Sequence, residues 1–392
     1  MEISETFCFF ARWVRFFIFL ALLESSSALM ESQLTAPVRW GIIGCGDVCQ
    51  VKSGPAFNKS ENSQLVAVMR RDVSKVKEFA QSHSVTSIYD KSEDIIQDPN
   101  VELLYVATPP GGDRVKIAQQ ITKAGKPALF EKPLARDARE AAEIVQLFKT
   151  AHVPLYVAYY RRHLPFVHYI KSVIENSDEN NNNLASIGDV SGVYITLFQD
   201  RHLHTRQHPW HLNKQISGGG KLLDVGSHML DLVDFLIGPM RDVVGYASQS
   251  GFSNSSDVED LVVGCWKHLL KNRIVPGTCR FNFCSGGPEI DEIQILGTKG
   301  RISFPCFGTH VSVNVYSQKE LVVKDFDNPT HIHQPLVQQI VNDELAWRHV
   351  SLSHQNTVCQ STAESGLRAS IVLDKLLNNR ASWEDNYLNY SR

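Results

Sequence analysis

The chain lacks clusters of basic residues and carries little net charge. Its 392 residues include 39 Lys and Arg against 42 Asp and Glu, a formal net charge of -3, and no run of Lys or Arg exceeds two residues. A chain without such clusters has no general attraction for nucleic acid or anionic membranes. We therefore expect a small-molecule substrate and further copies of the chain as partners, and no nucleic acid.

Cysteine is also scarce, and the common metal-binding spacings are missing. The eight cysteines form no Cys-x-x-Cys pair, and no His-Glu-x-x-His sequence occurs. These absences argue against a disulfide scaffold and against the usual zinc sites. We expect reduced thiols, a protein body of the cytoplasmic type and no metal site.

The N-terminal segment differs from the rest of the chain. An apolar run from Phe16 to Leu23 follows Arg12 and Arg15 and precedes a serine-rich stretch that reaches Ala28. This is the layout of a signal peptide. The run is too short to span a bilayer, so we expect no stable membrane span. A signal peptide, another targeting segment and an uncleaved extension all remain open for residues 1–36.

The apolar content is sufficient for a large core. Hydrophobic residues make up 43% of the chain and charged residues 21%. A chain of this length and composition favours two domains. The pattern changes near residue 159, so we expect a first domain over 37–158 and a second over 159–380, with a leader at 1–36 and a tail at 381–392.

The first domain opens with an apolar run that ends in a glycine turn. Residues Val38–Ile43 have the pattern of a buried strand, and a stretch able to begin a helix follows the turn. In a dinucleotide-binding turn, a side chain at either glycine would strain the backbone or block the diphosphate. We expect bare amides at the helix start to hold the phosphates. The expected binding residues are Gly44, Gly46, Asp47 and Val48.

Strands and helices then alternate along the first domain. Apolar runs at 64–69, 101–107, 128–130 and 154–158 are separated by helical stretches. Such alternation predicts an α/β Rossmann domain with a doubly wound parallel sheet, whose ligands bind at the carboxyl ends of the strands. At those ends we expect further cofactor contacts from Thr108, Pro109, Pro110, Glu131 and Lys132.

Two arginines end the second strand of this pattern. Arg70 and Arg71 stand where an acidic residue would bind the ribose 2′-hydroxyl of NAD. Because a guanidinium group suits a 2′-phosphate, the pair favours NADP as the cofactor, with NAD possible. The alternative is a solvated strand end with no role in binding.

Strand-like segments dominate from residue 189 onward. Short turns between successive strands predict an α+β domain with a large open, mostly antiparallel sheet. Apolar strands such as Val262–Trp266 and Thr278–Phe283 have more apolar surface than one layer of helices can cover. We therefore expect the other face of the sheet to meet another subunit, in a homodimer at least.

A second candidate site lies in the helical stretch after Gly218–Gly220. Apolar residues recur at helical spacing from Leu222 to Leu236, and Asp224 and His228 are four residues apart on one face. Burying a charged group costs several kcal/mol unless it is partnered, so we interpret the pair as part of a substrate site. A structural polar pair between domains is the alternative.

These motifs, in this order and spacing, resemble the glucose–fructose oxidoreductase / inositol dehydrogenase (Gfo/Idh/MocA) family. The resemblance rests on the glycine turn, the Thr108–Pro110 strand end, Glu131-Lys132-Pro133, Tyr160-Arg161 and the Gly218–Asp231 helix, and it covers roughly residues 37–380. It implies NAD(P)-dependent oxidation or reduction at a sugar, cyclitol or related carbon. It also implies dimers or tetramers formed through the C-terminal sheet.

The resemblance further implies catalytic roles. Lys132 would act on the reacting oxygen, Asp224 would lie beside the substrate, and His228 would donate or accept the proton. Tyr160 belongs to an element that lines the active site in some members. Whether Lys132 or His228 transfers the proton stays open.

The implied substrate contacts are Arg161, Trp210 and His211. Two positions depart from the family pattern: Cys49 replaces a small residue after the glycine turn, and His211 stands where relatives commonly have arginine. Two other functions on this fold stay open, a non-catalytic NADP-binding sensor and a cofactor-assisted glycosidase. A sensor would not need Lys132, Asp224 and His228, which we call the polar trio. A glycosidase would release sugar without net reduction of the cofactor.

Overall fold

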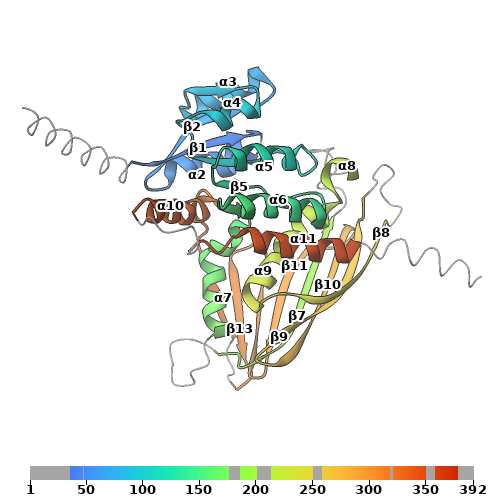
Figure 1. The fold of residues 1–392 in the computed structure, drawn as a ribbon. Helices are drawn as coiled ribbons and strands as arrows, with labels where there is room; N and C mark the ends of the chain where they lie inside the picture. Colours follow the sequence, from blue (N-terminus) through green and yellow to red (C-terminus); the bar gives the residue numbers. More distant parts are fainter. Residues whose placement is uncertain are drawn as a thin grey trace, which may run out of the picture.

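The structure, a computed structural model, describes residues 36–46, 48–175, 186–200, 213–249, 258–317, 321–349 and 358–377. Two sheets and their helices make up this part of the chain (Figure 1). The smaller sheet, with α2 to α6, lies above a broad, twisted second sheet in this view, and α11 runs between α6 and that second sheet.

The first sheet has six parallel strands in the order β3-β2-β1-β4-β5-β6. Its strands are β1 (Val38–Ile43), β2 (Ser63–Met69), β3 (Ser87–Tyr89), β4 (Leu103–Val106), β5 (Ala128–Phe130) and β6 (Leu155–Val157). The strand order reverses between β1 and β4, and ligands of doubly wound sheets bind outside such a switch point. The fold therefore directs attention to the loops after these two strands.

Helices flank this sheet because its strands are apolar on both faces. They are the π-helical turn η1 (Cys49–Ser53), α2 (Gly54–Lys59), α3 (Val73–His83), α4 (Ser92–Gln97), α5 (Arg114–Lys123) and α6 (Ala138–Ala151). All four residues of β4 are buried. Asp72 begins α3 by accepting hydrogen bonds from two backbone amides, and Asp137 begins α6 by accepting one from the Glu140 amide.

The second sheet has eight strands in the order β14-β13-β12-β11-β7-β10-β9-β8. They are β7 (Val190–Asp200), β8 (Arg241–Ser248), β9 (Leu261–Leu270), β10 (Arg273–Ser285), β11 (Ile290–Gly297), β12 (Gly300–Phe304), β13 (His310–Val315) and β14 (Leu321–Asp325). Neighbours pair antiparallel except β7 and β10, which are parallel. Alternate residues of the central strands are buried, so one face of the sheet carries the core.

The remaining helices connect the two sheets. They are η2 (Tyr160–His163), α7 (Pro165–Glu175), α8 (Lys214–Ser217), η4 (Leu222–Gly226), α9 (Ser227–Ile237), α10 (Gln334–His349) and α11 (Ala363–Leu377). Although α10 and α11 come last in the chain, α10 packs against α2 and β1, and α11 packs against α6, α9 and β8. The C-terminal helices therefore join both sheets into one body.

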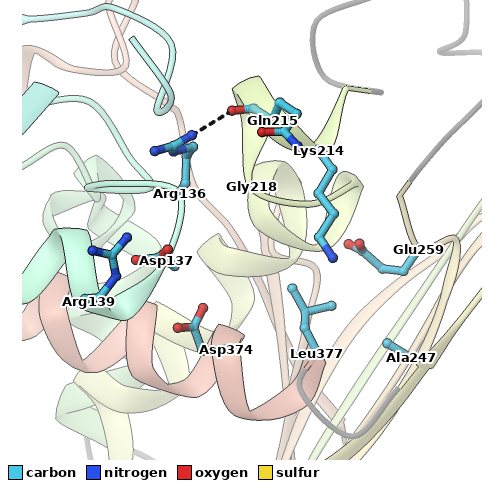
Figure 2. Close-up of a pocket in the computed structure, with 10 residues that line it drawn as sticks. All are labelled: Arg136, Asp137, Arg139, Lys214, Gln215, Gly218, Ala247, Glu259, Asp374 and Leu377. Carbon is cyan, nitrogen blue, oxygen red and sulfur yellow. Dashed lines mark hydrogen bonds between the residues drawn. The ribbon is translucent and has the colours of Figure 1, made fainter. Parts of the chain in front are cut away.

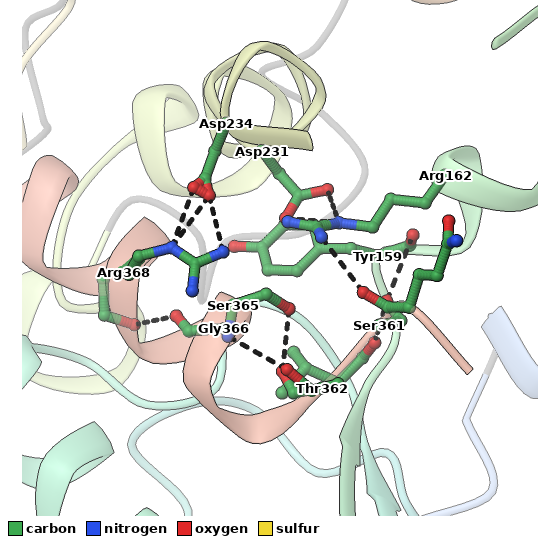
Figure 3. A network of polar contacts seen from close by, with 12 residues as sticks. Tyr159, Arg162, Asp231, Asp234, Ser361, Thr362, Ser365, Gly366 and Arg368 are labelled. Atoms are coloured by element: carbon green, nitrogen blue, oxygen red, sulfur yellow. Dashed lines mark hydrogen bonds and ion pairs between the residues drawn. The ribbon is translucent and has the colours of Figure 1, made fainter. Parts of the chain in front are cut away.

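A largely buried polar network holds α9 in place (Figure 3). Arg162, just after β6, donates to both carboxylate oxygens of Asp231 on α9, with Nη2 2.7 Å from Oδ1. One turn further, the Nε of Arg368 on α11 donates to both oxygens of Asp234 at 2.9 Å. Bidentate pairs of this kind fix orientation as well as distance.

The predicted fold class is confirmed, with three local differences. The segment expected to form one long helix from Gly218 instead contains the π-helical turn η4 before α9, and β3 and α4 were not expected. Seven cysteines lie in the described ranges, and all seven are free thiols. None of the helices in those ranges is both long enough and apolar enough to cross a membrane. The polar stretch 176–183 lies outside the described residues.

Candidate active site

The glycine turn after β1 forms one wall of a cleft of about 850 Å³. Gly44 has a φ of +89°, the left-handed region that favours glycine, and a Cβ there would come within 3.0 Å of Thr108 Cγ2. A Cβ at Gly46 would meet nothing closer than the Gly44 carbonyl at 3.9 Å. The turn therefore leaves open space in which the backbone can approach a ligand, as a dinucleotide diphosphate requires.

The expectation of bare amides in this turn is wrong for most of them. The amides of Gly44 and Cys45 donate to the Met69 carbonyl, and that of Gly46 donates to Gly44 at 2.8 Å. Cys49 and Gln50 bond back to the Gly46 carbonyl as the π-helical turn begins. The turn therefore supplies shape, and positive side chains nearby must supply most of the attraction for a phosphate.

Among the described residues, the cations that line this end of the cleft are Lys52, Arg70 and Arg71. Arg70 is tied to the turn itself, because its Nη1 donates to the Cys45 carbonyl at 3.0 Å. The nearby carboxylate of Asp72 accepts from the amides of Ser74 and Lys75 at the start of α3. The acidic group at this strand end is thus engaged in a helix cap.

At the other end of the cleft, Lys132 reaches across to the second half of the chain. Its Nζ donates to the Asp224 carboxylate at 2.7 Å and to the Asp224 carbonyl at 2.8 Å. Burial lowers the pKa of Lys132, but the charges of Asp224 and Glu131 outweigh this effect and raise it overall. Lys132 is therefore a firmly protonated amine. The Asp224 side chain remains 38% exposed, so it is more open than the sequence pattern suggested.

Two buried groups support the strand end that carries Lys132. Arg114, at the start of α5, donates to backbone carbonyls of Thr108, Glu131, Pro133 and Leu134 and so ties the β4 and β5 loops together. The Glu131 carboxylate accepts from the Tyr105 hydroxyl and from the Lys132 amide.

Glu131 also lies close to a histidine from the C-terminal part of the chain. His333 Nε2 is 3.4 Å from Glu131 Oε1. Burial raises the pKa of Glu131, but His333, Lys132 and Tyr105 together lower it overall. Glu131 is therefore a carboxylate near neutral pH, and it holds a negative charge behind Lys132.

His228 lies at the start of α9, where it is 5% exposed. The rings of Tyr159, Tyr160 and Phe307 approach it edge-on, with centroids 6.0, 5.3 and 6.1 Å away. Burial and the positive charges of Lys132 and Arg161 lower its pKa well below the usual value, against a smaller effect of Asp224. The imidazole is therefore neutral near pH 7, and its Nδ1 has no hydrogen-bond partner within the described part of the chain.

The cleft brings together every predicted site residue that the structure describes. Its walls include Gly44, Gly46, Val48, Arg70, Arg71, Thr108, Pro109, Pro110, Glu131, Lys132, Tyr160, Arg161, Asp224 and His228. The predicted contacts Asp47, Trp210 and His211 lie outside the described residues.

Several further residues line the cleft that sequence reasoning missed, and four of them carry polar or aromatic side chains that bear on the site: Lys52, Gln199, Phe307 and His333. The position of Lys52, close behind the glycine turn, is a signal that was available in the sequence. The other three come from the end of β7, the loop after β12 and the segment before α10, so only the packing of distant segments brings them to the cleft.

A second cavity of about 660 Å³ lies between α6, α8, β8 and α11 (Figure 2). Its charged groups largely serve local structure. Arg136 pairs with Glu140 and donates to the Gln215 carbonyl at 3.0 Å, and Asp374 accepts from the Ala138 amide at 2.8 Å. This cavity is separate from the cleft with the polar trio, and we assign it no chemistry.

Comparison with known proteins agrees with this geometry. Residues 38–159 match the model of an oxidoreductase family with an NAD-binding Rossmann fold, Gfo/Idh/MocA, and residues 185–303 match a C-terminal domain of the same family. An oxidoreductase of Formosa agariphila is 34% identical over 322 residues, which cover 81% of this chain and 92% of the relative. The chain belongs to the Gfo/Idh/MocA family.

One further relative and one solved structure are also similar to this chain. The trans-1,2-dihydrobenzene-1,2-diol dehydrogenase of Bos taurus is 28% identical over 73% of this chain and 78% of its own length. A solved levoglucosan dehydrogenase in complex with NADH and L-sorbose has the same fold, with a TM-score of 0.71 and 19% identity over 87% of this chain and 96% of that one. This Gfo/Idh/MocA protein is thus an NAD(P)-binding oxidoreductase.

Proposed function

We propose that the protein transfers a hydride between NADP and a secondary alcohol or carbonyl of a sugar, cyclitol or related small molecule. The observation that carries this proposal is the convergence of Lys132, Asp224 and His228 at one end of the cleft, opposite the cations at the other end. In this arrangement residues 37–158 bind the cofactor and residues 159–380 bind the substrate.

The charge states of the trio support oxidation of an alcohol. When bound, the nicotinamide accepts or supplies the hydride. A protonated Lys132 stabilises negative charge that develops on the substrate oxygen. A neutral His228 accepts the hydroxyl proton, and Asp224 holds the Lys132 amine in position. Tyr160 packs against His228 and restricts its ring.

The preference for NADP rests on the cations at the glycine turn. Lys52, Arg70 and Arg71 line that end of the cleft, and the nearby Asp72 caps α3. A 2′-phosphate gains charge-assisted hydrogen bonds from such groups, whereas a 2′-hydroxyl would need a free carboxylate.

Cofactor titration tests the preference. NADPH should bind more tightly than NADH, and Arg71→Ala should weaken NADPH binding by about tenfold or more while changing NADH binding little. Lys77→Ala, which removes an exposed cation from α3, is the matched control. Equal or tighter binding of NADH to the wild type would refute the preference.

A substrate screen tests the reaction itself. Sugars, cyclitols and small dihydrodiols should include compounds that reduce NADP⁺ in the presence of the protein. Tight NADPH binding without any coupled rate across the screen would contradict the proposed reaction, and release of sugar from an aryl glycoside without net reduction would replace it with glycoside cleavage.

The proposed assembly is a homodimer at least, formed through the outer face of the second sheet. That face exposes large apolar side chains, among them Tyr194, Val244, Tyr246, Val263 and Leu269. Exposed apolar patches of this kind mark contact surfaces. Light scattering should return a mass well above the 44.0 kDa of one chain, and a single-chain mass at micromolar concentration would refute the assembly.

A further inference from the structure

Arg161 is a buried cation with few partners of its own. Its side chain is 5% exposed, yet it lines the cleft beside His228 and Tyr160. Its Nη1 donates to the Cys306 carbonyl at 2.5 Å, its Nη2 makes a long contact of 3.4 Å with the Tyr160 hydroxyl, and its Nε has no partner among the described residues. A guanidinium group has five N–H donors, so most of this capacity is unused.

The other two buried arginines in the described ranges are fully engaged. Arg162 has the bidentate carboxylate of Asp231, and Arg114 donates to four backbone carbonyls. Arg161 has no carboxylate within ion-pair distance in the described chain. Asp291, a carboxylate whose charge interacts with Arg161, uses its two oxygens to accept from the amides of Cys306 and Phe307 at 2.8 and 2.7 Å.

An unpaired buried charge is costly, so a partner from outside the chain is expected. The surroundings of Arg161 indicate what that partner is. The guanidinium carbon lies 4.5 Å from the ring centroid of Phe307 and 5.3 Å from that of Tyr160. With aromatic rings against it, the group offers its edge, and the in-plane edge of a guanidinium matches the two oxygens of a carboxylate.

The position of Arg161 identifies the ligand as the substrate. Both rings that contact the guanidinium also contact His228, so the cation lies at the reacting end of the cleft. The cations suited to the phosphates of the cofactor, Lys52 and Arg71, line the glycine-turn end instead. Lys132 is already paired with Asp224, so among the cleft residues that the structure describes Arg161 is the cation available to a negative substrate at this end.

We propose that Arg161 binds a carboxylate of the substrate, so that the protein acts on hydroxy acids of the sugar class, such as uronic acids, in preference to the neutral parent sugars. This inference rests on the proposed dehydrogenase function. The Asp291 side chain acts indirectly, because it holds the loop that carries Phe307 against Arg161.

Matched substrate pairs test the proposal on the wild-type protein. D-galacturonate and D-glucuronate are compared with D-galactose and D-glucose in NADP⁺ reduction, with glucose 6-phosphate as a differently shaped anion. We expect kcat/KM for the acids to exceed that for the parent sugars by about 30-fold or more, the loss expected when one partner of a buried charge pair is absent.

Variants then locate the effect. Arg161→Met should abolish the preference for the acids, chiefly through KM, and Arg161→Lys should restore part of it because the charge remains without the planar edge. Arg301→Met, at an exposed arginine of β12, is the matched control and should keep the preference. Calorimetric titration of galacturonate into NADPH-loaded protein gives a binding readout that does not depend on turnover.

The outcomes separate this inference from the proposed function. If NADPH binds and neutral sugars react as well as the acids, the dehydrogenase function stands and the carboxylate site is wrong. The carboxylate site is also wrong if none of the acids binds, or if the protein prefers glucose 6-phosphate and this preference depends on Arg161. Should Arg161→Met fail to fold, the wild-type preference and Arg161→Lys still decide the matter. Absence of NADPH binding would instead refute the function itself.

Discussion

Arg162 and Asp231 form a bidentate ion pair in the interior, with both side chains at most 3% exposed. The pair connects the segment after β6 to α9. Asp231 lies three residues beyond His228 on that helix. Tyr159 to Arg162 thus contact α9 at two levels, with the tyrosines against His228 and Arg162 against Asp231. The geometry around His228 therefore depends on this buried pair.

Breaking this pair should destabilise the fold strongly. Asp231→Asn leaves Arg162 buried without a compensating charge, so the free energy of unfolding should fall by about 3–5 kcal/mol. Denaturant unfolding followed by circular dichroism measures the loss. The double variant Arg162→Met/Asp231→Leu should lose less free energy of unfolding than the single variants Arg162→Met and Asp231→Leu lose in sum. Full additivity would contradict the pairing.

Removing Lys132 or His228 should affect the rate far more than the fold. We expect Lys132→Ala and His228→Ala each to lower kcat/KM by roughly two or more powers of ten, because one stabilises developing charge and the other moves a proton. NADPH binding should stay within a few-fold. Activity and melting temperature are measured on the same samples, and activity that merely follows the folded fraction would indicate a structural pair.

The two glycines of the turn should respond differently to alanine. Gly44 has a positive φ and Gly46 does not, so Gly44→Ala should cost roughly 1–2 kcal/mol of stability through backbone strain. Gly46→Ala faces open space and should fold normally, yet its methyl group enters the region expected to hold the diphosphate. Thermal melting and NADPH titration of both variants check this, and unchanged cofactor binding by Gly46→Ala would refute the phosphate assignment.

Glu344 on α10 should make stability depend on pH. Burial, with the nearby charges of Asp343 and Glu102, raises its pKa from 4.5 to about 8 against the opposing effect of Arg348. Between these two values the folded protein binds more protons than the unfolded chain, so this group's contribution to stability falls as pH rises from about 5 to 8.

Replacing that carboxyl removes the pH dependence. Glu344→Gln should therefore raise the melting temperature relative to the wild type more at pH 8 than at pH 5. Glu364→Gln, at an exposed position of α11, is the control for loss of a carboxyl group. An equal difference at both pH values would contradict the shifted pKa.

The sequence alone determined the alternation of strands and helices in the first sheet apart from β3 and α4, the glycine turn and the strand end that carries Lys132. These features depend on local periodicity and on which residue types a turn tolerates, and both are readable along a single segment. The switch between η4 and α9 escaped this reasoning, because a π-helical turn keeps the apolar pattern of a helix while it changes the hydrogen bonding.

The tertiary structure decided which side chains meet and which amides remain available. Lys132 and Asp224 are 92 positions apart in the sequence, yet Lys132 Nζ lies 2.7 Å from Asp224 Oδ1. Phe307 and His333 reach the same cleft from segments with no recognisable motif. Their placement depends on how the second sheet and α10 pack against the first domain, and packing is set by the combined shape of many buried side chains. For the same reason, only the structure identified Arg161 as a buried cation whose carboxylate partner is not found among the residues described.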